Sequence, residues 1–216
     1  MNDTDTPIEP SAPSPHPLAR DFARAIASSN AGRVLLLGFG SGRNVPPVLA
    51  AAPRVVILED DAERARAASA RFAGDGRIEI VHAPYGATGA LAGSFAGALT
   101  THALLHGNPA SVGAAVANVR ERLESQAPFF MTLASKSDPR YGQGDRLDAD
   151  TYAAPSGSEA GVPHVFFDLA GVRALLDGFQ FDALEERDAS ETAGAWAHAP
   201  HDAATLRHWF VWARRP

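Results

Sequence analysis

The sequence predicts an α/β fold in which helices cover both faces of a mostly parallel, seven-stranded sheet whose C-terminal strand is reversed. An apolar run from Val34 to Leu37 leads directly into the glycine-rich turn of residues 38–42, which is the pattern of a buried parallel strand. Strand and helix patterns alternate through residues 18–134, an order typical of a parallel sheet. Two segments of alternating apolar and polar residues close the chain, and they predict a terminal antiparallel pair.

The first half of the chain supplies an opening helix and two strand–helix units. Leu18, Phe22 and Ile26 recur at helical spacing, which predicts a helix before the first strand. The prolines of VPPVLAAA (45–52) suit a helix only in its first turn. A second apolar strand, VVILE, comes next, and Asp61 is the expected N-cap of the helix that follows it.

The second half continues the alternation and then interrupts it. A third strand is expected at residues 77–83, and a fourth starts at residue 95 and runs into a loop that ends at residue 107. A helix over 109–125 and a fifth strand at 127–135 follow. Residues 136–163 are rich in Gly, Asp, Ser and Pro without any period, so we expect an irregular segment that is functional or disordered. The next helix has Asp168 as its expected N-cap and Gly178 as its C-cap. The closing strands are expected within 181–189 and 206–216.

Length and composition indicate one domain. The 216 residues suffice for a single α/β domain, predicted over 17–216, after a polar, proline-rich tail, residues 1–16, that we expect to be disordered. A formal net charge of −6 argues against a nucleic-acid partner. The absence of cysteine excludes disulfides and thiolate metal sites, and no apolar run is long enough to span a bilayer. We therefore expect a cytoplasmic protein without a membrane partner, and the oligomeric state stays open.

The glycine-rich turn predicts a site for an adenosine-containing cofactor. Such a turn lets ligand and backbone approach closely, and the next helix presents unpaired N–H groups. Gly38, Gly40 and Gly42 alternate, whereas a dinucleotide fold requires Gly-x-Gly-x-x-Gly and hence glycine at the position of Arg43. S-adenosylmethionine has no pyrophosphate and does not need that third glycine, so the spacing favours it over NAD and FAD.

An acidic residue supports the same cofactor. Glu59 ends the second strand about 20 residues beyond the turn, where a carboxylate can accept hydrogen bonds from both ribose hydroxyls. Asp60 and Asp61 follow it, and Asp61 is better explained as a helix cap.

These segments together resemble a class I S-adenosylmethionine-dependent methyltransferase, of the kind found in small bacterial methyltransferase-domain proteins. RVLLLGFGSGRN is similar to the first motif of that family, VVILEDDAERA to the second, and SFAGALTTHALLHG to the fourth strand and the loop beyond it. The C-terminal GVPHVFFDLAGVRALLDGFQF and HWFVWAR are similar to its last helix and reversed strand pair. The resemblance covers about residues 18–214 and implies a Rossmann-like fold, S-adenosylmethionine as cofactor and a small-molecule methyl acceptor.

Three positions depart from the family pattern. The family carries an acid two residues before the first glycine, which helps to hold the cofactor's amino group, and here that residue is Leu36. The family often has an acid after the third strand, but here the segment is VHAPYG, in which backbone groups and the Tyr85 ring could hold adenine. At the start of the fourth strand, Phe95-Ala96 stands where the family usually has Phe-Asp. Two alternatives therefore stay open. One is a degenerate cofactor-binding relative without methyltransferase activity. The other is an NAD-dependent oxidoreductase, although Arg43 argues against it.

The resemblance implies a cofactor site at the turn and at the ends of the second, third and fourth strands. Its predicted members are Gly38, Phe39, Gly40, Ser41, Gly42, Asn44, Glu59, Asp60, Ala83, Pro84, Thr100 and Thr101. Arg43 or Asn44 could also reach the cofactor carboxylate, although an arginine at such a position is more often solvated.

Candidates for the acceptor side lie past the fourth strand and around the irregular segment. His102 and His106 are the catalytic candidates, because a histidine at this edge could orient or deprotonate an acceptor, or could only satisfy a loop carbonyl. Tyr141, His164 and Phe166 could form an aromatic lid over the acceptor, with a core role as the alternative for Phe166.

No metal site is predicted. His102 and His106 are four residues apart, a spacing that brings side chains together on a helix, but Asn108-Pro109 starts the helix later. The His and Trp residues near the C-terminus show no ligand spacing.

Overall fold

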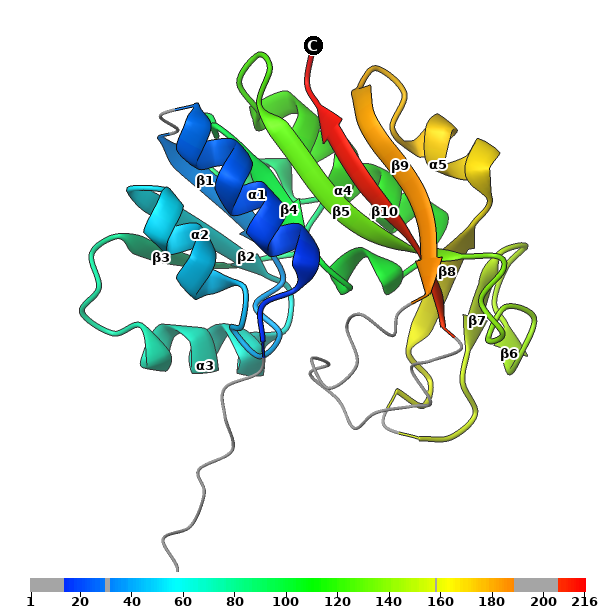
Figure 1. Ribbon diagram of the computed structural model, residues 1–216. Helices are drawn as coiled ribbons and strands as arrows, with labels where there is room; N and C mark the ends of the chain where they lie inside the picture. Colours follow the sequence, from blue (N-terminus) through cyan, green and yellow to red (C-terminus); the bar gives the residue numbers. More distant parts are fainter. Residues whose placement is uncertain (1–13, 30–31, 158, 189–205) are drawn as a thin grey trace, which may run out of the picture.

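A computed structural model describes residues 14–29, 32–157, 159–188 and 206–216 of the chain, and it confirms the predicted fold class (Figure 1). The central strands lie in the order β3-β2-β1-β4-β5 and are parallel, whereas β10 is antiparallel to β5 and β9 is antiparallel to β10. The strands are β1 (Arg33–Leu37), β2 (Arg54–Glu59), β3 (Ile78–His82), β4 (Ala98–Thr100), β5 (Pro128–Ser135), β6 (Asp145–Arg146), β7 (Thr151–Ala153), β8 (Pro163–Phe167), β9 (Gln180–Asp188) and β10 (Arg207–Arg214).

Two hydrophobic layers hold helices against the sheet. The α-helices are α1 (Pro17–Ser28), α2 (Val45–Ala51), α3 (Ala62–Arg71), α4 (Pro109–Arg122) and α5 (Leu169–Leu175), with short 3-10 helices η1 (Thr88–Ala90) and η2 (Ala103–Leu105). Side chains of α1 and α2 pack with Val34 and Leu36 of β1 on one face, and those of α4 and α5 pack with Leu35 and Leu37 on the other. The alternation along β1 follows from the two-residue period of a strand, so the central strand is apolar on both sides.

Helix capping explains where several helices start. Asp61 accepts a hydrogen bond from the backbone N of Arg64 at 2.7 Å, and Asp168 accepts one from Gly171 at 2.7 Å, so both predicted N-caps are confirmed. The predicted C-cap Gly178 is wrong, because α5 ends at Leu175 with Leu176 as its C-cap.

The segment after β5 is more regular than its composition predicts. β8 pairs in parallel with the last two residues of β5, and β7 and β6 extend it as an antiparallel ribbon, so the expectation of an irregular 136–163 segment is wrong in part (Figure 1). Phe166 and Phe167 lie in β8 rather than at the opening of a helix. The ribbon places β6 and β7 next to β8, which pairs with the carboxyl end of β5 near the site described below.

The described part of the chain begins before the predicted domain boundary. His16, assigned to the tail from sequence, is fully buried and caps α1, because its Nδ1 accepts a hydrogen bond from the backbone N of Leu18 at 3.1 Å. Residues 1–13 lie outside the described residues. No helix in the described ranges is long and apolar enough to cross a membrane.

Candidate functional site

The carboxyl ends of β1, β2 and β4 open into one cavity. It holds about 770 Å³ of space that no protein atom fills, part of it open to solvent, which is the size range of small-molecule and cofactor sites. Its lining residues are Gly38, Phe39, Gly40, Ser41, Arg43, Asn44, Glu59, Arg64, Tyr85, Thr101, His102, Ala103, Leu105, His106, Arg140, Glu159 and His164. The position agrees with the general rule that open α/β sheets bind ligands beyond the carboxyl ends of their strands.

The glycine turn has a backbone that only glycine adopts without strain. Gly38, Gly40 and Gly42 have φ values of +84°, +52° and +74°. A Cβ on Gly38 would lie 2.7 Å from the Cβ of Ala103, and one on Gly42 would lie 2.6 Å from the Phe39 ring. The turn therefore passes close to η2 and folds over its own phenylalanine, which leaves Gly38 and Gly40 at the cavity wall.

Glu59 ties the glycine turn to the end of β2. Its Oε2 accepts a hydrogen bond from the backbone N of Phe39 at 2.7 Å, and its Oε1 accepts from the backbone N of Asp61 and from Nε of Arg64, both at 3.1 Å. A carboxylate has about four lone-pair positions, so Oε2 keeps one for a ligand hydroxyl. Glu59 is buried at the cavity wall, in the place predicted for the ribose-binding acid.

Tyr85 covers this carboxylate from the side of β3. Its hydroxyl lies 3.5 Å from Oε1 of Glu59. Burial, together with the charges of Glu59 and Asp60, raises the pKa of the Tyr85 phenol above its ordinary value, so the hydroxyl stays protonated and acts as a donor. Burial and a hydrogen bond with Glu59 also raise the pKa of Asp60.

Asn44 joins three segments at the other end of the turn. Its Oδ1 accepts from the backbone N of His16 at 3.0 Å, and its Nδ2 donates to Oγ1 of Thr101 at 2.8 Å. The residue therefore holds the start of α1 and the end of β4 against the glycine turn. This is a structural role in addition to the cofactor role predicted from sequence.

Arg43 is a buried cation at the cavity wall. Its exposed fraction is 8%. The expectation that Arg43 is solvated is therefore wrong. Its Nη1 is buried without a hydrogen-bond partner among the described residues, and none of these forms an ion pair with the guanidinium. Burial lowers the pKa of Arg43 to about 10, which leaves it charged at neutral pH. The site thus contains a desolvated positive charge that is suited to an anionic ligand.

Three histidine rings pack edge-on or tilted against one another near Arg43. The His102 ring lies 5.2 Å from the His16 ring and 5.3 Å from the His208 ring, between ring centroids. Burial, with smaller contributions from neighbouring charges, lowers the pKa of His16 to about 3 and of His208 to about 4, and it lowers that of His102 as well. These rings are therefore neutral at physiological pH.

His102 also has an unusual backbone. Its φ of +64° lies in the left-handed region, and its backbone N donates to Oγ1 of Thr132 at 2.9 Å. A non-glycine residue in this region is uncommon, and such conformations cluster at functional sites. The turn directs the chain from β4 into η2, which separates His102 from His106.

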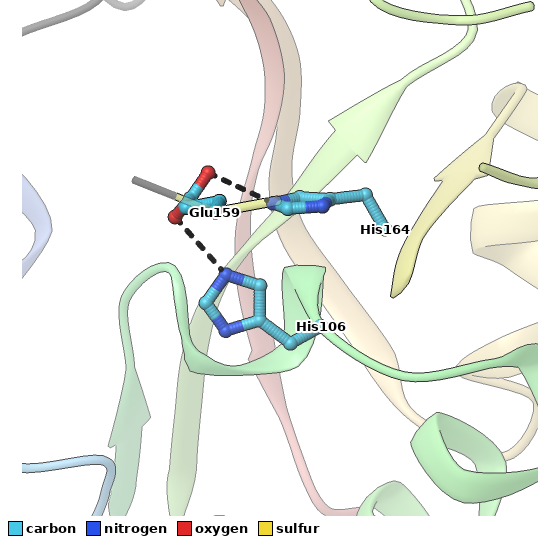
Figure 2. Close-up of side chains that lie close together, drawn as sticks. All are labelled: His106, Glu159 and His164. Carbon is cyan, nitrogen blue, oxygen red and sulfur yellow. Dashed lines mark ion pairs between the residues drawn. The ribbon is translucent and has the colours of Figure 1, made fainter. Parts of the chain in front are cut away.

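A second group of side chains lies at the opposite end of the cavity. Nε2 of His164 is 3.2 Å from Oε2 of Glu159, and Nε2 of His106 is 3.5 Å from Oε1 of the same carboxylate (Figure 2). His106 and His164 form an isolated antiparallel β-bridge, so the backbone holds the two residues side by side. The two histidines hold the pKa of Glu159 well below its ordinary value, and the carboxylate is ionised.

A second, mostly apolar cavity of about 630 Å³ adjoins this group. It shares Arg140, Glu159 and His164 with the first cavity and is otherwise lined by residues of the ribbon between β5 and β8. Arg140 is held by Asp138, with its Nε 2.9 Å from Oδ1 and its Nη2 3.0 Å from Oδ2. The boundary between the cavities is therefore polar, and the space beyond it is apolar.

The cavity gathers most, but not all, of the predicted site residues. Those that line it are Gly38, Phe39, Gly40, Ser41, Asn44, Glu59, Thr101, His102, His106 and His164. Gly42 lies behind the turn, Thr100 is buried at the end of β4, and Asp60, Ala83 and Pro84 lie beyond the wall near Tyr85. Tyr141 donates to Oδ1 of Asp150 at 3.0 Å and packs on Phe166 and Tyr152. Phe166 and Tyr152 line the second cavity, whereas Tyr141 lines neither cavity.

Sequence reasoning missed five residues that line the first cavity and one residue behind it: Arg64, Ala103, Leu105, Arg140 and Glu159, and His16, whose ring packs against that of His102. His16 was assigned to the tail, and Arg140 and Glu159 lie in the segment that was treated as irregular. The run of residues 159–164, EAGVPH, contains a carboxylate and an imidazole, and this is the one local signal that could have drawn attention to Glu159.

The fold recurs in solved structures of low sequence identity, whereas no protein-family model and no curated protein sequence matches the chain. A SAM-dependent methyltransferase from Methanosarcina mazei is 14% identical, with a TM-score of 0.67, over 85% of this chain and 92% of its own. CalS10, an amino pentose methyltransferase from Micromonospora echinaspora solved with SAM bound, is 17% identical, with a TM-score of 0.62, over 92% of this chain and 90% of its own.

A third similar structure is 1,6-didemethyltoxoflavin-N1-methyltransferase from Burkholderia thailandensis, solved with 1,6-didemethyltoxoflavin and S-adenosylhomocysteine bound. It is 19% identical, with a TM-score of 0.61, over 92% of this chain and 78% of its own. At these identities the likeness concerns the fold, and it confirms that the chain has the fold of the class I S-adenosylmethionine-dependent methyltransferases.

Proposed function

We propose that the protein is an S-adenosylmethionine-dependent methyltransferase that acts on a small-molecule acceptor. One observation carries the proposal: the Glu59 carboxylate and the desolvated Arg43 cation both line a single cavity. A ligand that fits this pair needs vicinal hydroxyls at one end and a carboxylate at the other. S-adenosylmethionine has both, in its ribose and its methionine part. The solved neighbours with SAM or S-adenosylhomocysteine bound support the same assignment.

The chain's own residues would bind and orient this cofactor. Glu59 would accept from a ribose hydroxyl through the free lone pair of Oε2, and Tyr85 would move aside or pack on the adenine. Arg43 would pair with the carboxylate, which satisfies the buried Nη1. When bound, S-adenosylmethionine supplies a methyl group on a positive sulfur, and the C–S bonding electrons return to sulfur as the acceptor's lone pair forms the new bond.

The protein's part in that reaction is to align the acceptor and exclude water. The acceptor would enter from the second, apolar cavity and cross the boundary formed by His106, Glu159 and His164. We propose His106, which lines the first cavity, as the base that would take the proton that an amine or hydroxyl acceptor releases. His102 is less suited to this role, because burial lowers its pKa and makes its ring a weak base.

A binding-only relative is the second candidate, and Leu36 is the observation that favours it. Leu36 has an exposed fraction of 3% and packs in the hydrophobic layer with α1 and α2, so the family's acid is replaced by a core residue. An Asp at this position would bury a charge in that layer, which makes Leu36→Asp a poor test of cofactor affinity.

Calorimetry with S-adenosylmethionine and S-adenosylhomocysteine tests the cofactor assignment. We expect saturable binding that is weakened by Glu59→Gln and unchanged by Glu63→Gln, whose residue lies on α3 outside the cavity. No binding of either compound at millimolar concentration would reject the proposal. Binding without release of S-adenosylhomocysteine in the presence of a broad set of small amines and alcohols would favour the binding-only relative.

A further inference from the structure

We propose that His106, Glu159 and His164 bind a divalent first-row transition-metal ion, such as Zn²⁺ or Co²⁺, at the boundary between the two cavities (Figure 2). Two imidazoles and one carboxylate form a common ligand set for such ions, which leaves further coordination positions open to water or a substrate. Metal binding by these three residues does not depend on the proposed function. Only the role of the ion toward a methyl acceptor rests on it.

The spacing of the ligand atoms fits one ion. Atoms that each lie about 2.1 Å from one metal at a tetrahedral angle are about 3.4 Å apart. The measured separations are 3.2 Å from Nε2 of His164 to Oε2 of Glu159 and 3.5 Å from Nε2 of His106 to Oε1. One ligand atom from each of the three residues lies within 4.8 Å of the others. A small rotation of the rings would therefore bring all three to one centre.

Hydrogen bonding at His164 orients its ring so that Nε2 faces the carboxylate of Glu159. Nδ1 of His164 is 3.0 Å from the backbone O of Val162, which can only accept, so Nδ1 carries the hydrogen. With a hydrogen on Nδ1, Nε2 is the ring nitrogen that faces Oε2 of Glu159 and is available to coordinate a metal ion.

The contact of His164 with Val162 also matches the surroundings of known metal ligands. A metal-bound histidine almost always donates its other ring N–H to a carbonyl or carboxylate, which fixes the ring and its tautomer. The bridge between the His106 and His164 segments and the hydrogen bond from the backbone N of Gly107 to the O of Pro163, at 2.9 Å, hold both histidines before any ligand arrives. The site is therefore largely formed in advance.

The location gives the ion access to both cavities. His106, Glu159 and His164 line the first cavity, and Glu159 with His164 also lines the second. Under the proposed function, an amine or hydroxyl acceptor reaching in from the apolar side could coordinate the ion beside the methyl-donor cavity. With Nε2 of His106 bound to the ion, that imidazole would no longer serve as the base, and coordination itself would orient the acceptor atom and make its proton easier to lose.

The test is a titration of the full-length, untagged protein, stripped with a chelator, with Co²⁺ followed by visible absorption and with Zn²⁺ followed by calorimetry. We expect one ion per chain for the wild type. We expect at least a roughly tenfold loss of affinity in Glu159→Gln, which keeps the side-chain volume, and in His106→Phe and His164→Phe. Circular dichroism and thermal melting establish that each variant is folded.

Two controls separate this site from other histidines. His82→Ala removes an exposed histidine on β3 outside the cavities and should leave binding unchanged. The double variant His198→Ala/His201→Ala, in a segment outside the described residues, should also bind the ion normally. No binding by the wild type, or binding that survives Glu159→Gln and is lost in the double variant, would overturn the proposal.

The same samples are titrated with S-adenosylhomocysteine in the presence of chelator. Cofactor binding without metal binding would reject the metal site and leave the proposed function standing. Metal binding without cofactor binding would support the metal site and reject the proposed function. The two failures are therefore distinguishable.

Discussion

Arg43 offers a prediction in which stability and ligand binding change in opposite directions. The guanidinium is 8% exposed and forms no ion pair with any described residue. Burial lowers its pKa to about 10, well below its ordinary value, and since each pKa unit corresponds to about 1.4 kcal/mol, the buried charge costs about 3 kcal/mol. Arg43→Met keeps an apolar stem of similar length and removes the charge. We therefore expect the unliganded variant to be more stable than the wild type, by up to about 3 kcal/mol.

The same substitution should weaken cofactor binding. A hydrogen bond to a charged partner contributes about 1.5–3 kcal/mol, so the loss of the Arg43 contact with a ligand carboxylate should reduce affinity roughly 10- to 100-fold. Urea denaturation of the unliganded protein measures the first effect, and calorimetric titration with S-adenosylhomocysteine measures the second. Arg43→Lys is the matched control, because it keeps the positive charge and should show neither the full gain in stability nor the full loss of affinity.

The reasoning is refuted if Arg43→Met binds the cofactor as tightly as the wild type. It is also refuted if the unliganded variant is less stable, because the guanidinium would then have a stabilising partner in the free protein.

Three further substitutions or conditions test other parts of the site. Glu59→Gln should weaken S-adenosylhomocysteine binding at least roughly tenfold in calorimetry, because the amide accepts with one oxygen only. Gly38→Ala should lower the free energy of unfolding by about 1–3 kcal/mol in urea denaturation, because φ is +84° and the new Cβ would lie 2.7 Å from that of Ala103. Stability should fall as the pH is lowered from about 6.5 to 4, by about 1.4 kcal/mol per pH unit for each of His16 and His208.

The sign of the pH effect follows from the two pKa values. Burial lowers the pKa of His16 to about 3 and of His208 to about 4, whereas the unfolded imidazole binds a proton near pH 6.5. The unfolded state therefore binds more protons in this window and is favoured as the pH falls. His208→Asn should reduce the slope, and an unchanged slope would show that His208 is not buried as a neutral ring.

Matched controls accompany the other two substitutions. Gly113→Ala, on α4 with no atom within 4 Å of the added Cβ, should leave stability unchanged or raise it slightly. If Gly38→Ala were equally harmless, the close approach of the turn to η2 would be in doubt. If Glu59→Gln bound the cofactor normally, the ribose assignment would be wrong.

Local sequence patterns predicted the sheet and the glycine turn because both depend on short-range signals. The apolar run before Gly38 and the two-residue alternation in β10 are properties of single segments, and the structure confirms both strands. Asp61 and Asp168 were predicted as caps for the same reason, since a cap binds a backbone N–H three residues away.

Long-range contacts explain what the sequence did not predict. Glu159 meets His106 across more than 50 positions of the chain, and no local period marks such a contact. Arg43 lies near the buried His16, whose backbone N donates to Asn44 in a contact between residues 28 positions apart. The ribbon of β6 and β7 is short and rich in turn residues, so its pairing with β8 could not be read from its composition.

The central claim is that Glu59 and Arg43 hold the two ends of one S-adenosylmethionine molecule. A crystal structure of the protein with S-adenosylhomocysteine tests it most directly. The account predicts a ribose hydroxyl on Oε2 of Glu59, the carboxylate on the Arg43 guanidinium, and the sulfur facing the group formed by His106, Glu159 and His164. A ligand bound elsewhere, or one whose carboxylate lies in solvent while Arg43 stays without an anion, would contradict it.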